Sequence, residues 1–284
     1  MQSLWMIVAS ALFACMGVCV KLGATLLSAA ELVFYRGAIA LVLVGGFALV
    51  RRLSLATPHW RAHLWRSLAG SVSLVLYFYA ISVLPLAMAV TLNYTSPLFL
   101  ALILAVWAGE RVRRGLFVAL ALGLAGVTLL LRPSLEAAQW LGGAAALASG
   151  AGAGLAYFHV RQLGRLGEPE WRTVFYFSLA AAVIGLPWLL SGPALHAVDG
   201  RTAWLVLGVG GFGALAQLAM TRAYKRGRTL VSASLAYSTV VFASLFGALL
   251  WDEMLPPSAW LAIGMIVVSG LLASAQSRAP VEQD

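Results

Sequence analysis

The chain has 284 residues, of which 62% are hydrophobic and only 10% are charged, and its mean hydropathy is +0.91. A water-soluble domain of this size could not bury so much apolar surface in one core, so the composition excludes a soluble enzyme and predicts an all-α integral membrane protein. The net charge of +9 would be typical of nucleic-acid binding in a soluble protein, but the placement of the basic residues explains it differently.

Apolar segments long enough to cross a membrane follow one another along the chain. About twenty helical residues span the hydrocarbon, so each uninterrupted stretch predicts one helix. The stretch 67–109 is long enough for two helices, which turn near Leu84 and Pro85, and 32–50 contains a single charged residue, Arg36. Continuous rather than alternating apolar runs favour helices over a β-barrel. We therefore expect ten transmembrane helices, over 3–20, 32–50, 67–109 (two), 115–131, 137–160, 173–198, 202–221, 229–251 and 254–277.

Basic residues concentrate on one side of this ten-helix topology. With a cytoplasmic N-terminus, fifteen of the nineteen Lys and Arg residues, Arg66 among them, fall on the cytoplasmic side, and only Arg132 and Arg201 on the other. This bias is the positive-inside pattern. It predicts a multi-pass plasma-membrane protein with both termini in the cytoplasm, the lipid bilayer as its surroundings and no nucleic-acid partner.

A polar segment of the first half recurs in the second. Residues 91–99 match residues 234–242 at a constant offset of 143, and the match continues to Glu110 and Glu253. Five helices precede the connection around Pro133 and five follow it. Because five is odd, the second copy enters the membrane upside down. The sequence thus predicts two inverted five-helix repeats, residues 1–133 and 134–284, with a substrate site where they meet.

The recurring segment places hydroxyl groups on one helix face in each repeat. Hydroxyls in a bilayer need partners, so both faces are expected to point inward and to line a cavity; the alternative is that they bond back to their own helix while the tyrosines pack between helices. Pro97 cannot donate its amide, which frees the carbonyl of Asn93 either to bind substrate or to let the helix bend, and the second copy has Val240 instead. The substrate-binding candidates are Tyr77, Thr91, Asn93, Tyr94, Thr95, Tyr157, Gln217, Ser234, Tyr237 and Ser238.

Three charged residues fall within or beside the first two helices: Lys21, Glu31 and Arg36. Pairing of Glu31 with one of the bases, or snorkelling, would make them tolerable, whereas an unpaired base could attract a substrate carboxylate. Glu110 and Glu253 end equivalent helices and are expected to pair with nearby bases or to cap neighbouring helix N-termini, and thus to hold the bundle at each end.

A row of small residues marks the helix expected over 137–160. Gly142, Ala146, Gly150 and Gly154 recur at four-residue spacing and predict a surface that another helix approaches closely. No phosphate-binding loop, metal-ligand cluster or Ser-His-Asp set is recognisable, so the sequence predicts neither an enzyme nor a cofactor.

The stretch from Gln217 to Leu235, followed by Tyr237, Gly247 and Glu253, resembles the second repeat of EamA-type members of the drug/metabolite transporter superfamily. Matching signatures of the first repeat are Pro97-Leu98-Phe99, Gly109-Glu110-Arg111 and the segment from Glu31 to Arg36. The likeness covers essentially the whole chain, although Asp252 stands where the family often has glycine. It implies a ten-helix inner-membrane carrier that works by alternating access and is similar to exporters of amino acids, including aromatic ones.

Two other functions are compatible with the same residues. The chain could import another metabolite, nucleotide-like or cationic, although no acidic residue lies at a helix centre to pair with a buried cation. It could also be a non-transporting membrane scaffold in which the polar faces hold helices together.

Overall fold

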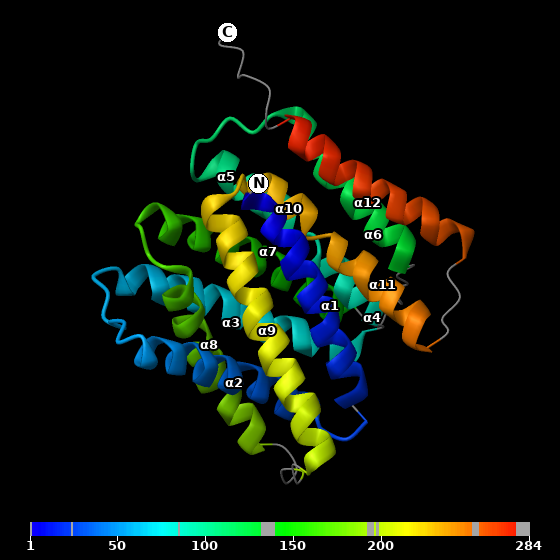
Figure 1. Ribbon diagram of the computed structural model, residues 1–284. Coiled ribbons are helices and arrows are strands. Elements are labelled where there is room, and N and C mark those ends of the chain that lie inside the picture. The colour runs from blue at the N-terminus through cyan, green and yellow to red at the C-terminus, as the bar shows by residue number, and fades with distance from the viewer. Residues whose placement is uncertain are drawn as a thin grey trace.

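The computed structural model describes residues 2–23, 25–84, 86–131, 140–191, 196, 199–251 and 256–276, which form a short 3-10 turn and twelve α-helices (Figure 1). Glu253 and Asp252 lie outside the described residues. The first half contains α1 (Trp5–Gly23), α2 (Ala29–Val50), α3 (Trp60–Val83), α4 (Leu86–Asn93), α5 (Ser96–Val106) and α6 (Arg114–Leu131). The second contains α7 (Trp140–Arg165), α8 (Glu170–Ser191), α9 (Gly200–Arg226), α10 (Thr229–Leu235), α11 (Ser238–Trp251) and α12 (Pro257–Gln276).

The helices have the composition and the surface of a membrane protein. Seven segments of the described chain, two of them the joined spans Ala89–Val106 and Thr229–Trp251, are long and apolar enough to cross a bilayer. Large apolar side chains face outward, for example Val42, Leu190 and Leu249, which are 71%, 72% and 77% exposed. Outward apolar side chains are stable in lipid rather than in water, so the chain is an integral membrane protein.

Two of the expected helices are broken near their middles. The segment after α3 divides into α4 and α5 at Tyr94 and Thr95, and the segment 229–251, expected as one helix, divides into α10 and α11 at Ala236 and Tyr237. The two breaks lie at corresponding positions of the two halves, because their separation differs by only one residue from the 143-residue offset. Discontinuous helices at corresponding positions of two halves are typical of transporter binding sites.

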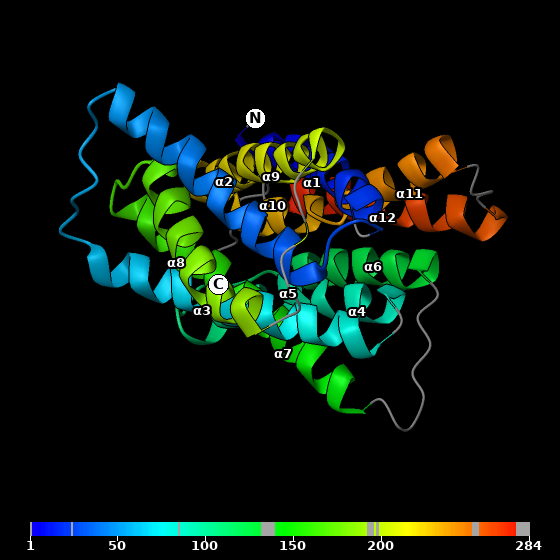
Figure 2. The ribbon, with the colours of Figure 1, turned by 90° about the horizontal axis from the view of Figure 1, so that it is seen from below.

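The helix contacts are reciprocal between the halves. Helices α3 and α7 lie side by side. Their counterparts in the other half, α9 and α1, also lie side by side. In the same way α5 contacts α7 while α11 contacts α1, and α2 contacts α9 while α8 contacts α3. The pairs α2 with α8 and α6 with α12 join equivalent helices directly. Figure 2 shows the α9–α1 pair and the α3–α7 pair on opposite sides of the molecule.

Candidate functional site

The two helix breaks are closed by the same hydrogen bond. The Thr95 Oγ1 hydroxyl donates to the Leu92 carbonyl over 2.6 Å, and the Ser238 Oγ hydroxyl donates to the Leu235 carbonyl over 2.6 Å. These hydroxyls therefore bond to their own segments, which is the alternative that the sequence left open. Pro97 lies in the first turn of α5, where proline is favoured. The second break has no such proline, so a break at the corresponding position can form without one.

On one side, the α4–α5 break contacts α7. The Asn93 side-chain amide donates to Ser149 Oγ over 2.9 Å. A Cβ added to Gly150 would lie 2.5 Å from Thr95 Oγ1, and one added to Gly154 would lie 3.0 Å from the Ser96 carbonyl. The small residues of α7 thus let the break approach its backbone, as their spacing predicted.

The α10–α11 break faces the pair α6 and α12. Ser234 Oγ lies 2.7 Å from Ser269 Oγ, and the Tyr237 hydroxyl donates to the Leu120 carbonyl over 3.3 Å. Both residues are fully buried. Ser234 and Tyr237 therefore have partners among these helices, whereas Asn93 and Thr95 face α7.

Between the breaks lies a cluster of tyrosines. The rings of Tyr94 and Tyr237 are 6.1 Å apart, and those of Tyr157 and Tyr224 stack at 4.7 Å with an interplanar angle of 15°. Tyr77 lies within electrostatic range of Tyr94. Four of these five are sequence candidates; the fifth, Tyr224, is 1% exposed and its hydroxyl has no hydrogen-bond partner among the described residues. Thr91, also a candidate, is buried in α4.

The charged residues near the first two helices do not pair with one another. Glu31, 2% exposed, caps α2 by accepting the Ser28 amide over 2.7 Å, and it accepts the His196 amide over 2.7 Å. Lys21 lies over the Trp251 ring, with its Nζ 4.0 Å from the ring centroid. The expected pairing of Glu31 with Lys21 or Arg36 is therefore wrong, because Ser28 and His196 occupy both carboxylate oxygens.

Arg66 was expected in a cytoplasmic connection, but it lies inside α3 and is 2% exposed. The connection ends earlier than the charge pattern indicated, because α3 already begins at Trp60. The Arg66 guanidinium stacks on Phe177, 4.0 Å from the ring centroid. Neither Arg66 nor Phe177 was predicted as a site residue; the only available signal was a basic residue directly before the apolar stretch 67–109, with Gly70 one turn later.

A narrow cavity among α2, α8 and α9 is lined by the other interior cation, Arg36. It has a volume of about 10 Å³, about the size of one water molecule, and its lining residues include Arg36, Ser178, Gln217 and Phe177. Gln217, a sequence candidate, is 5% exposed and its Nε2 has no hydrogen-bond partner among the described residues.

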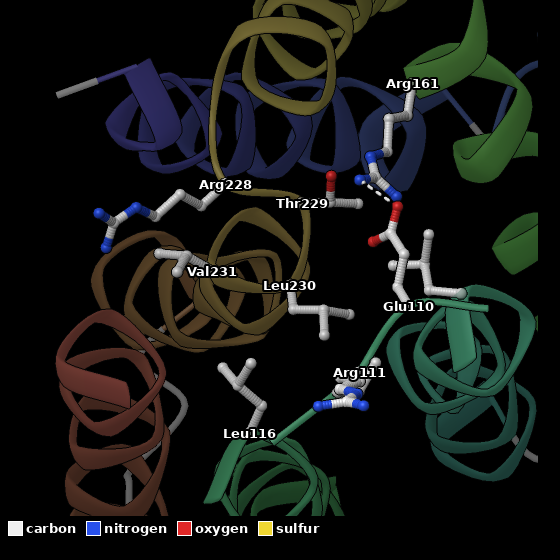
Figure 3. Close-up of a pocket in the computed structure, with 10 residues that line it drawn as sticks. Glu110, Arg111, Leu116, Arg161, Arg228, Thr229, Leu230 and Val231 are labelled. Atoms are coloured by element: carbon white, nitrogen blue, oxygen red, sulfur yellow. Dashed lines mark hydrogen bonds and ion pairs between the residues drawn. The ribbon is translucent and has the colours of Figure 1, made fainter. Parts of the chain in front are cut away.

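The larger cavity, about 180 Å³, lies away from the tyrosines at the ends of α5 and α7 and the start of α10 (Figure 3). Figure 3 shows Arg161 pointing at Glu110, with an Nη2–Oε1 distance of 2.7 Å. Arg165 contacts the same carboxylate oxygen at 2.9 Å, so the expected pairing of Glu110 with nearby bases is confirmed. Partial burial alone would raise the pKa of Glu110, but the hydrogen bonds and charges of Arg161 and Arg165 outweigh it and hold that pKa below its ordinary value.

A second ionic network joins α3, α8 and the connection after α2. Glu168 accepts hydrogen bonds from Thr57 and from Arg172 Nη1, the latter over 2.9 Å, and lies 3.2 Å from His63 Nε2. Burial alone would raise the pKa of Glu168, but these hydrogen bonds and the Arg172 charge lower it. His159 contacts Gln162 within α7, with a distance of 2.9 Å between His159 Nδ1 and Gln162 Oε1.

The arrangement can be compared with known proteins. The EamA-like transporter family matches residues 1–132 and again residues 140–275. The chain is 30% identical over 274 residues to the pseudopaline exporter CntI of Pseudomonas aeruginosa, which covers 96% of this chain and 95% of that protein. It is 28% identical over 246 residues to a riboflavin transporter of Vibrio cholerae, covering 84% and 79% of the two chains.

A solved crystal structure shares the fold, with a TM-score of 0.87 and 22% identity over 98% of this chain and 99% of the other. The helical fold, the paired helix breaks and the two sequence matches agree with one another. The chain therefore belongs to the EamA-like transporter family of the drug/metabolite transporter superfamily and is a multi-pass membrane transporter.

Proposed function

We propose that the protein is a secondary transporter of the bacterial inner membrane that exports amino acids or related small metabolites by alternating access. The observation that carries the proposal is the pair of equivalent helix breaks, which meet at the tyrosine cluster where Tyr94 lies 6.1 Å from Tyr237. Transporters of related architecture bind substrate at broken helices near the bilayer midplane.

Ten spans in two inverted repeats, 1–133 and 134–284, form part of this proposal. Joining α4 with α5 and α10 with α11 gives five spans in each half. The reciprocal contacts of α3 with α7 and of α9 with α1 are those expected when a two-fold axis relates the halves. The odd number of spans in each half makes this axis lie in the membrane plane.

The charge bias supports cytoplasmic termini. In that orientation the basic ends around Arg111, Arg161 and Arg228 face the cytoplasm, and so does the larger cavity that they line. Lys and Arg beside membrane spans are retained on the cytoplasmic side.

Export of a small metabolite is supported by the similarity to the pseudopaline exporter, and the tyrosine cluster suits an amphipathic molecule with an apolar part. Import of another metabolite is the second candidate, and a flavin-like substrate would agree with the match of a riboflavin transporter to 84% of this chain. A non-transporting scaffold would use the same tyrosines only to hold helices together.

A growth screen separates export from import. Cells that overproduce the protein are challenged with toxic amino-acid analogues and other toxic metabolites; resistance indicates export, and sensitisation indicates import. Reconstitution in liposomes then measures flux of the compounds that the screen selects. An absence of flux across a broad panel would contradict transport.

The variants Tyr94→Phe and Tyr237→Phe separate a transporter from a scaffold. In a transporter, Tyr94→Phe lowers flux while the thermal unfolding temperature stays near that of the wild type. In a scaffold, it lowers the unfolding temperature or partner binding instead. Tyr79→Phe is the matched control, because Tyr79 is 47% exposed.

A further inference from the structure

Two interior arginines lack an acidic partner among the described residues. The Nε of Arg36 and the Nε and Nη1 of Arg66 are buried without hydrogen-bond partners. The five acidic residues that the structure describes lie near helix ends and have other partners: Glu31, Glu110, Glu168, Glu170 and Asp199. A buried unpaired charge is costly, so the fold alone does not account for these two arginines.

The two arginines belong to one cluster. Phe177 and Arg36 line the same cavity, and the Arg66 guanidinium lies over the Phe177 ring, 4.0 Å from the ring centroid. Tyr157, stacked on Tyr224, lies within electrostatic range of both arginines, and the arginines lie within range of each other. The cations are thus next to the tyrosine cluster rather than on a separate surface.

The groups left without partners there are mainly hydrogen-bond donors. Besides the arginine N–H groups, the Gln217 side-chain amide donates to no described residue. Snorkelling toward solvent does not explain Arg66, which is 2% exposed. Buried donors that carry two positive charges match an oxyanion, and an arginine fork binds a carboxylate through two parallel hydrogen bonds.

We propose that Arg36, Arg66 and Gln217 bind a carboxylate group of the transported substrate, whose remaining part contacts Tyr157 and Tyr224. This inference rests on the proposed transport function and specifies its substrate as an anion or a carboxylate-rich metabolite. The cavity of about 10 Å³ beside Arg36 is too small for such a molecule, so binding requires α2, α8 and α9 to separate.

Binding of named probes to the purified full-length protein tests the proposal. Glutarate and citrate should raise the thermal unfolding temperature and bind in calorimetric titration, whereas glutaramide, the neutral isostere of glutarate, should do neither. Equal effects of glutarate and glutaramide would overturn the carboxylate site. Stabilisation by inorganic phosphate but by neither carboxylate would overturn it as well.

Arginine variants locate the binding. Arg36→Gln and Arg66→Gln should each weaken glutarate binding by about tenfold or more, the effect of one charge-assisted hydrogen-bonding group. Arg114→Gln, which removes an exposed cation from the start of α6, should bind glutarate like the wild type. If Arg36→Gln and Arg66→Gln both bound glutarate with wild-type affinity, the proposed carboxylate site would be contradicted.

Stability without ligand distinguishes a binding role from a structural one. If the arginines serve a ligand, Arg66→Gln should unfold at the wild-type temperature or above it, because an unpaired buried charge has been removed. A marked fall in the unfolding temperature would show that Arg66 serves to stabilise the fold. Should Arg66→Gln fail to fold, Arg66→Lys keeps the charge but loses the fork, and unchanged glutarate affinity in that variant would contradict the proposal.

Flux separates this inference from the proposed function. If Arg36→Gln and Arg66→Gln left transport of a selected metabolite unchanged, the transport function would stand and the carboxylate site would be overturned. Arginine-dependent glutarate binding without flux of any compound would retain the site and overturn transport.

Discussion

The charged groups at the ends of the helices differ from those in the interior. At the ends, Glu110 and Glu168 each have two or more basic or hydroxyl partners, and these join helices that are distant in sequence. In the interior, Arg36 and Arg66 have no acidic partner among the described residues. Charges at the ends therefore hold the bundle together, while the interior charges remain available to a ligand.

The largest expected effect concerns the end networks. Glu168→Ala leaves the buried His63 and the partly buried Arg172 without their carboxylate, so we expect a loss of about 3 kcal/mol or more in the free energy of unfolding. Glu170→Gln is the matched control, because its partner Arg226 is 56% exposed and such pairs contribute about 1 kcal/mol or less. Thermal unfolding in detergent measures both, and equal losses would remove the distinction between buried and exposed ion pairs.

A smaller effect concerns uncharged packing in the interior. Gly150→Ala places a methyl group against Thr95 and the Leu92 carbonyl, so it should destabilise the protein by about 1–3 kcal/mol and disturb the α4–α5 break. Gly46→Ala adds the same group to α2 where nothing lies within 4 Å, and it should leave stability unchanged or raise it. A stable, active Gly150→Ala variant would contradict the close contact of α7 with the break.

Acid should selectively weaken the ionic networks at the helix ends. The pKa values of Glu110 and Glu168 are lowered in the folded protein, so their stabilisation is complete above the unfolded-state value of about 4.3. It is lost as the pH falls through the lowered values, because the carboxyls must then be protonated. The unfolding temperature should therefore decrease as the pH is lowered from 7 to 3, and this decrease should be less steep in Glu168→Gln. An identical acid slope in that variant would show that Glu168 does not contribute.

The smallest effect tests the equivalence of the two breaks. Thr95→Ala and Ser238→Ala each remove one hydroxyl bond to a carbonyl at the end of a half-helix, so each should cost about 1 kcal/mol. Similar losses in unfolding temperature support equivalent breaks. A large loss in one variant alone would show that the two halves are held differently.

Local patterns in the sequence predicted much of the fold. Apolar runs located the helices, and both breaks fall within the segment that repeats at 143-residue offset, although the second of these helices was expected to be continuous. Tyr77 and Tyr79 are about 200° apart on an ideal helix, and Tyr79 is 47% exposed while Tyr77 is partly buried, as helical periodicity requires. Helical periodicity and hydrophobicity are properties of neighbouring residues, which is why they can be predicted.

Long-range partners could not be predicted in the same way. Glu31 was expected beside the bases nearest in sequence, but it binds His196, 165 residues away. The break at Ala236 had no proline signal, and Arg66 was assigned to a connection because its burial depends on α8, which supplies Phe177. These features depend on how the two halves meet, which no single segment encodes.

The most direct test of the account measures flux and unfolding temperature on the same preparations of Arg36→Gln and Glu168→Ala. We expect Arg36→Gln to lose transport of a carboxylate substrate in liposomes while unfolding near the wild-type temperature, and Glu168→Ala to unfold at a much lower temperature. If Arg36→Gln transported the substrate normally, or lost as much thermal stability as Glu168→Ala, the assignment of interior charges to a ligand and of end charges to the fold would be contradicted.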